Sequence, residues 1–70
     1  MEDFKYYSNK SRFLMRKPTL ENLTKSAQYL RLAEVELLVE NSEENIQVFE
    51  KQKSQLSAFF QRKNVDVALK

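Results

Sequence analysis

Apolar residues recur every three or four positions through the middle of the chain, a spacing that places them on one face of an α-helix. These residues are Leu20, Leu23, Ala27, Leu30, Ala33 and Leu37. Pro18 suits the first turn of a helix, and the hydroxyl of Thr19 can accept a hydrogen bond from a free backbone N–H there. The pattern predicts a helix from about Thr19 to Glu40.

A second apolar stripe follows the polar pair Asn41 and Ser42. Asn tolerates the left-handed backbone conformation that ends a helix, and Ser is a good cap for the next one. The stripe consists of Ile46, Phe49, Leu56 and Phe60, with Lys53 as an interruption. It predicts a second helix over about residues 43–63. Two helices joined by so short a connection lie antiparallel, so residues 18–70 are expected to form a helical hairpin.

The two ends of the chain carry weaker patterns. Residues 1–17 form a basic and aromatic segment with apolar residues at helical spacing, but residues 8–11 include turn-forming types. A short helix from Asn9 to Arg16 and a longer one both fit this segment, and residues 65–70 fit either more helix or an extended tail. The patterns together predict a single all-α domain, a hairpin with a partly helical N-terminal segment, that assembles into a helical bundle.

Composition narrows the functions open to this chain. It contains no Cys and no His, so it lacks disulfides and the usual ligands of zinc and other transition metals. It contains no Gly, on which phosphate-binding loops and the nucleophile elbow depend. The carboxylate pairs Glu34 with Glu40 and Glu43 with Glu44 are expected to face water. We therefore expect a non-enzymatic protein that needs no cofactor.

Nothing in the sequence predicts secretion or membrane insertion. The N-terminus lacks the basic and apolar regions of a secretory signal. The apolar runs are far shorter than the roughly 20 residues that cross a bilayer as a helix. These features favour a cytoplasmic protein without a membrane partner.

The first predicted helix carries more apolar surface than one neighbouring helix can cover. Leu32, Val35 and Val39 recur at helical spacing but lie away from the stripe that faces the second helix, and with Tyr29 they form a candidate protein interface. Either residues 1–17 fold back over this face or it packs against another subunit. In the first case the covering residues would be Phe4, Tyr7, Phe13 and Leu14. The second is favoured because so small a chain buries little surface alone.

Charges are unevenly distributed, although 12 basic and 10 acidic residues leave a net charge of only +2. An antiparallel hairpin gathers Glu36, Glu40, Glu43 and Glu44 near its connection and cations near its open end. Glu36 and Glu40 lie near the C-terminus of their own predicted helix, where the helix dipole disfavours anions. A solvated acidic surface and a cationic partner would both account for them.

Basic and aromatic residues are interleaved in the N-terminal segment, and this mixture can neutralise phosphates and stack on bases. The candidate contacts with nucleic acid or an acidic partner are Lys10, Arg12, Arg16, Lys17, Arg62 and Lys63. A net charge of +2 is small for a dedicated nucleic-acid binder. The sequence therefore predicts first a self-associating protein–protein interaction module, such as an adaptor, regulator or small chaperone. The alternative is a dimeric hairpin that binds nucleic acid.

Overall fold

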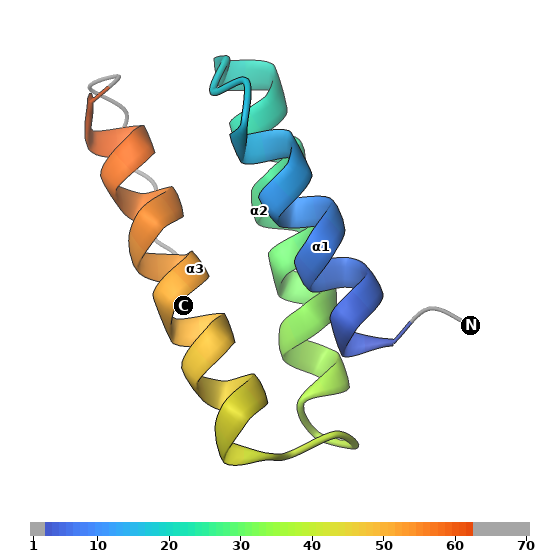
Figure 1. Ribbon diagram of the computed structural model, residues 1–70. Helices are drawn as coiled ribbons and strands as arrows, with labels where there is room; N and C mark the ends of the chain where they lie inside the picture. The colour runs from blue at the N-terminus through green and yellow to red at the C-terminus, as the bar shows by residue number, and fades with distance from the viewer. Residues whose placement is uncertain (1–2, 63–70) are drawn as a thin grey trace.

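The computed structural model describes residues 3–62, which form three α-helices and no strand. The helices are α1 (Phe4–Met15), α2 (Leu20–Glu36) and α3 (Glu43–Arg62). Figure 1 shows that consecutive helices run antiparallel, so α1 and α3 point the same way. The all-α class is confirmed, α2 and α3 form the predicted hairpin, and α1 packs mainly against α2. Lys63 and the predicted tail 65–70 lie outside the described residues.

The N-terminal segment forms the longer of the two helices that its sequence allows. The side chain of Asp3 caps α1 by accepting a hydrogen bond from the backbone N–H of Tyr6 at 2.9 Å. The turn-forming residues Ser8 and Ser11 do not end the helix, because both are buried against the other helices. The helix instead ends just before the Lys17–Pro18 bond, as expected because a residue preceding proline disfavours helical angles.

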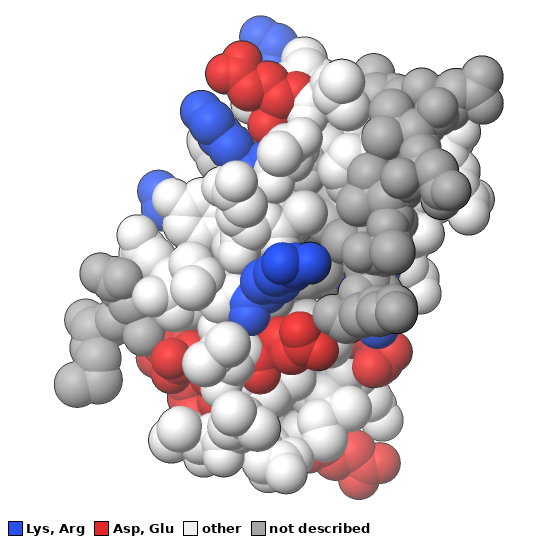
Figure 2. All heavy atoms as spheres, turned by 180° about the vertical axis from the view of Figure 1, so that it is seen from behind, with Lys and Arg blue, Asp and Glu red and all other residues white. Residues whose placement is uncertain are grey.

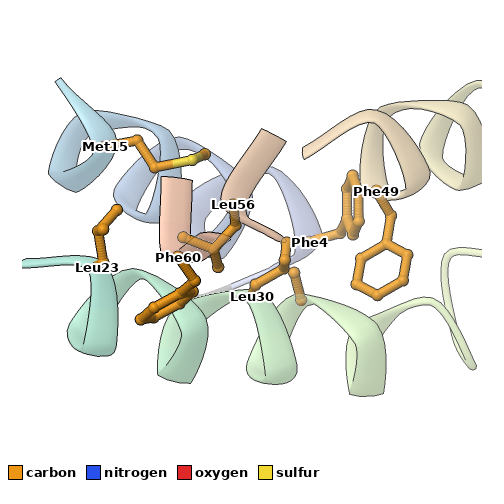
Figure 3. Packing of buried hydrophobic residues seen from close by; sticks show 8 residues of the cluster. Phe4, Met15, Leu23, Leu30, Phe49, Leu56 and Phe60 are labelled. Carbon is orange, nitrogen blue, oxygen red and sulfur yellow. The ribbon is translucent and has the colours of Figure 1, made fainter. Parts of the chain in front are cut away.

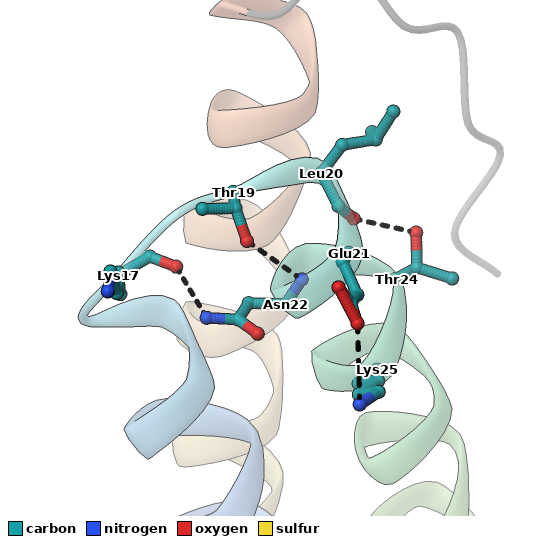
Figure 4. A network of polar contacts seen from close by, with 7 residues as sticks. All are labelled: Lys17, Thr19, Leu20, Glu21, Asn22, Thr24 and Lys25. Atoms are coloured by element: carbon teal, nitrogen blue, oxygen red, sulfur yellow. Dashed lines mark hydrogen bonds and ion pairs between the residues drawn. The ribbon is translucent and has the colours of Figure 1, made fainter.

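The start of α2 is stabilised by local hydrogen bonds between neighbouring residues (Figure 4). The Thr19 hydroxyl accepts from the backbone N–H of Asn22 at 3.2 Å, and the Asn22 amide donates to the carbonyl of Lys17 at 2.9 Å. In the same first turn, the Glu21 carboxylate lies 3.8 Å from the ammonium group of Lys25, one turn further along the helix. The predicted capping role of Thr19 is therefore confirmed.

The end of α2 differs from the prediction, since the helix stops at Glu36 and not near Glu40. Just beyond Glu36 two backbone hydrogen bonds have a three-residue spacing, with Leu38 bonded to Val35 and Val39 to Glu36 at 3.1 Å each, before the N–H of Glu40 bonds the Glu36 carbonyl at 2.8 Å. This earlier end coincides with a contact to the neighbouring helix. The Glu40 carboxylate accepts a hydrogen bond from the backbone N–H of Phe4 at 2.9 Å, at the positively polarised start of α1.

The core consists of apolar side chains from all three helices, which point toward one another in Figure 3. The buried apolar residues are Phe4, Met15, Leu23, Leu30, Ala33, Phe49, Leu56 and Phe60. Two members of the predicted stripes, Leu20 and Ile46, are exposed, while Ser26 and Gln52 are buried. Lys53 does interrupt the apolar stripe of α3, and its ammonium group lies 5.9 Å from the centre of the Phe49 ring.

A buried polar layer crosses the middle of the bundle. The Ser8 hydroxyl donates to the side-chain oxygen of Gln52, whose amide nitrogen donates back to the Ser8 carbonyl at 2.9 Å. The Ser26 hydroxyl donates to the Ser11 carbonyl at 2.8 Å and lies 2.8 Å from the Ser11 hydroxyl. Among the described residues, every buried side-chain nitrogen and oxygen has a hydrogen-bond partner. Because such bonds form in one alignment only, this layer sets the register of the helices.

Candidate interaction surfaces

A group of apolar side chains remains exposed at the C-terminal end of α2 and just beyond it. We call it the α2 patch; its residues are Leu32, Val35, Leu38 and Val39, with exposed fractions of 43%, 58%, 84% and 82%. In Figure 2 the end of the molecule with the α2–α3 connection, at the bottom, presents uncharged atoms among most of the acidic side chains in view. In the sequence, the acidic residues Glu34, Glu36 and Glu40 lie between or directly next to the residues of the patch.

The N-terminal segment does fold back, but onto a different face of α2. The buried residues of α2 are Leu23, Ser26, Leu30 and Ala33, and these form the face toward α1 and α3. Of the residues expected to cover the α2 patch, Phe4 enters the core, Tyr7 and Leu14 are half-buried, and Phe13 is 65% exposed. The predicted interface residues Leu32, Val35 and Val39 consequently stay uncovered within the described part of the chain.

Tyr29 is the predicted interface residue that lies apart from the patch. It is half-buried, and its ring stacks on that of Tyr7 with the centroids 6.4 Å apart. The ring of Tyr6 in turn contacts Tyr7 edge-on at 5.4 Å. Tyr29 therefore belongs to the contact between α1 and α2.

Leu38 is the patch residue that the predicted interface did not include. A helix that continued to Glu40 would place Leu38 next to Leu37, at the edge of the predicted stripe. Since the helix ends at Glu36, Leu38 follows the tighter turn outward and is 84% exposed. The earlier end could not be foreseen from local residues, because it accompanies the contact of Glu40 with α1.

The predicted acidic cluster at the connection is partly used inside the molecule. Glu40 lies beyond its own helix and caps the N-terminus of α1, where the helix dipole favours an anion. This contact gives the Glu40 carboxylate a favourable position within the molecule. Glu36 is half-buried, whereas Glu43 and Glu44 are exposed in the first turn of α3, a favourable end for anions.

A second candidate surface lies on the outward side of α1, where a hollow of about 520 Å³ opens to solvent. Its lining residues are Tyr6, Asn9, Lys10, Arg12, Phe13 and Arg16. A further hollow of about 360 Å³ adjoins it between α1 and α3, since Arg12 and Arg16 line both, and adds Phe59 and Arg62. The structure thus brings together four of the predicted basic residues. Lys17 is exposed in the α1–α2 turn outside both hollows.

The cations of this surface lie beside aromatic rings. The Lys10 ammonium is 5.9 Å from the centre of the Tyr6 ring, and the Arg16 guanidinium is 5.9 Å from that of Phe13. On α3, the Arg62 guanidinium is 5.5 Å from the centre of the Phe59 ring. Cations in such positions are attracted by the electron-rich ring faces. Each pair places a positive charge and an apolar ring next to each other at the surface.

Within residues 3–62 no group of three or more acidic side chains is arranged to hold a metal ion. None of the described helices is both long enough and apolar enough to span a membrane. The expectation that the chain is not an enzyme stays a prediction.

Comparison with known proteins adds no family to this description. No family of known proteins matches the sequence, and neither curated proteins nor solved structures show significant similarity to it. The α2 patch and the basic surface of α1 are the features of the described residues that point to a function.

Proposed function

We propose that this protein is a non-catalytic protein–protein interaction module that acts through the α2 patch. The observation that carries the proposal is the exposure of Leu32, Val35, Leu38 and Val39, from 43% to 84%, in a chain whose N-terminal helix has already folded back. Single exposed apolar residues are normal on a protein surface, whereas grouped ones are typical of interaction sites. Their burial in a complex would release water from all four side chains at once.

The partner we propose is a second copy of the same chain. A core of eight buried apolar residues, divided by the polar layer, is small. A single core of this size supplies on the order of 3–5 kcal/mol, and small proteins supplement it with disulfides, metals or association. The sequence contains no Cys and no His, which leaves association as the natural supplement.

Residue spacing on α2 supports a parallel arrangement of the two copies. Leu32, Val35 and Val39 follow the three-and-four spacing of a helix–helix seam, with Val39 in the turn beyond the helix. Arg31 precedes the first seam residue and Glu36 follows the second, and such flanking positions form ion pairs across parallel helices. In a parallel dimer each Arg31 would face Glu36 of the partner subunit, so the charges at the seam would be complementary.

The test is the mass of the purified chain by sedimentation equilibrium over a range of concentrations. We expect a dimer for the wild type and a monomer for the double variant Leu32→Glu, Val35→Glu, with unchanged helical circular dichroism. Leu20→Glu is the matched control, because Leu20 is 50% exposed on the same helix but lies outside the patch. It should leave the dimer intact.

Two results would overturn the proposal. A wild-type chain that sediments as a monomer at every concentration would exclude the second copy as the partner. Loss of helicity in the double variant would mean that Leu32 and Val35 belong to the monomer core.

A further inference from the structure

The basic surface of α1 gathers several positive charges on one helix. We call it the α1 face and define it by Tyr6, Lys10, Arg12, Phe13 and Arg16, which line the larger hollow. Neither this hollow nor the adjoining one has a carboxylate among its described lining residues. Within residues 3–62, the ion pair present is that of Lys25 with Glu21, so none of the cations of the α1 face is engaged in an ion pair with a described carboxylate.

Another hollow at the N-terminal end of α1 provides a contrast. It measures about 300 Å³ and includes Asp3, Glu40 and Glu44 together with Lys5 and Arg12. Positive and negative side chains are mixed there, so its local charge largely cancels. Arg12 lines both hollows, but the hollow of the α1 face has cations and no carboxylate among its described lining residues, which favours an anionic ligand.

Exposed aromatic rings accompany these cations. Phe13 is 65% exposed and Tyr6 is 40% exposed, which is more than packing against α2 or α3 would leave. The two residues are seven positions apart on one helix, so their rings are separated by about 10 Å along its axis. Each ring has a cation 5.9 Å from its centre. The α1 face thus repeats a unit of one cation and one ring.

We propose that the α1 face binds single-stranded nucleic acid. In this arrangement Lys10, Arg12 and Arg16 contact phosphates, and the rings of Phe13 and Tyr6 stack on unpaired bases. Such combinations of a positively charged groove with stacking rings bind single strands with little sequence preference. Arg62 and Phe59 extend the surface onto α3 through the adjoining hollow.

Other anionic partners match the surface less completely. A duplex keeps its bases stacked on each other, so Phe13 would find no base to stack on. A helix that lies on a membrane needs a broad apolar face. The exposed large apolar residues of α1 are only Tyr6 and Phe13, each beside a cation. An acidic protein segment would pair with the cations but would leave the exposed rings of Tyr6 and Phe13 without a stacking partner.

The first experiment measures fluorescence anisotropy of labelled 20-nucleotide dT and U oligomers at several salt concentrations. We expect affinity to fall with salt, because phosphate contacts release counterions, with a slope of about −2 in log K against log salt for three contacts. The variant Arg12→Glu, Arg16→Glu should lose roughly tenfold or more in affinity at low salt and have a shallower slope.

The matched control reverses the same number of charges elsewhere. Lys25 and Lys51 are exposed on α2 and α3, outside both hollows, and Lys25→Glu, Lys51→Glu lowers the net charge equally. Its affinity should stay within about twofold of the wild type at moderate salt, where distant charges are screened. An equal loss in both variants would overturn the proposal, because binding would then follow net charge and not the α1 face.

The stacking role is tested separately with Phe13→Ala and Phe13→Trp. Because one stacked base is lost, the affinity of Phe13→Ala for the oligomer should decrease about fivefold or more, while Phe13→Trp should retain binding. Unchanged affinity in Phe13→Ala would overturn the stacking role. So would equal affinity for heparin, a polyanion without bases, or for a duplex of the same length. Binding to phosphatidylserine vesicles without binding to oligomers would assign the surface to a membrane.

The experiments distinguish a failure of nucleic-acid binding by the α1 face from a failure of self-association through the α2 patch. The monomeric variant Leu32→Glu, Val35→Glu leaves the α1 face intact, so it should still bind the oligomer with the same dependence on Arg12 and Arg16. Conversely, Arg12→Glu, Arg16→Glu should still sediment as a dimer.

Discussion

The inward and outward faces of α2 carry similar apolar residues but differ in exposure to solvent. Leu23, Leu30 and Ala33 on the inward face are at most 3% exposed, whereas Leu32 and Val35 on the outward face are 43% and 58% exposed. Helical periodicity identifies both stripes equally well. The two faces differ in their small residues: Ser11 and Ser26 meet at the inward contact, where small side chains allow two helices to approach closely.

The largest expected effect is the difference in stability between truncating a leucine on the inward face and truncating one on the outward face. Leu23→Ala should lower the free energy of unfolding by about 2.7–5 kcal/mol, because it leaves a cavity at a fully buried site. Leu32→Ala should change it by less than about 0.5 kcal/mol where the chain is monomeric, since surface changes are small. Urea unfolding at low protein concentration measures both. Equal losses would show that the two faces are buried alike.

A second change tests the close approach at the inward face. Ser26→Leu should lower the free energy of unfolding by about 1–3 kcal/mol, because it overpacks the contact with Ser11. It also removes the hydrogen bond to the Ser11 carbonyl. Thr24→Leu is the control, since Thr24 is exposed on the same helix. If both variants unfold at the same urea concentration, small size at residue 26 is not what brings α1 onto α2.

The smallest expected effect concerns the charges that flank the outward face. Arg31→Glu and Glu36→Arg should each raise the dissociation constant of the proposed dimer by up to roughly fivefold for each ion pair lost, the scale of exposed ion pairs of about 0.2–1 kcal/mol. Combining them should restore the wild-type value, because the opposite charges then face each other again. Sedimentation at low salt measures the change. Additive losses in the combined variant would contradict the parallel arrangement.

Local sequence signals predicted much of the fold. The features they did not predict depend on contacts between residues far apart in the sequence. The caps Thr19 and Ser42 act as predicted, with Ser42 accepting a hydrogen bond from the backbone N–H of Asn45 at 3.1 Å. A cap involves residues three positions apart, so the sequence contains all that is needed. The full length of α1 could not be foreseen, because Ser8 and Ser11 find partners 44 and 15 residues away.

The candidate surfaces also combine features that local sequence predicts with features that depend on how the helices pack. The basic and aromatic residues of α1 follow from helical spacing once the helix is known to span Phe4–Met15, but their union with Arg62 requires α3 to lie alongside. The exposure of Leu38 likewise depends on where α2 ends. Tyr29 seemed equivalent to Leu32 in the helical pattern, yet its ring meets that of Tyr7, which only the position of α1 explains.

Short-range chemistry was enough for three features of this protein: its all-α class, the antiparallel hairpin and the excess of apolar surface on α2. Each depends on periodicity, caps or residue types within a few positions of each other. Long-range packing chose the face of α2 that α1 covers, the polar layer and the capping of α1 by Glu40. These depend on pairs of residues 15 to 44 positions apart, whose mutual fit becomes defined only when the helices meet.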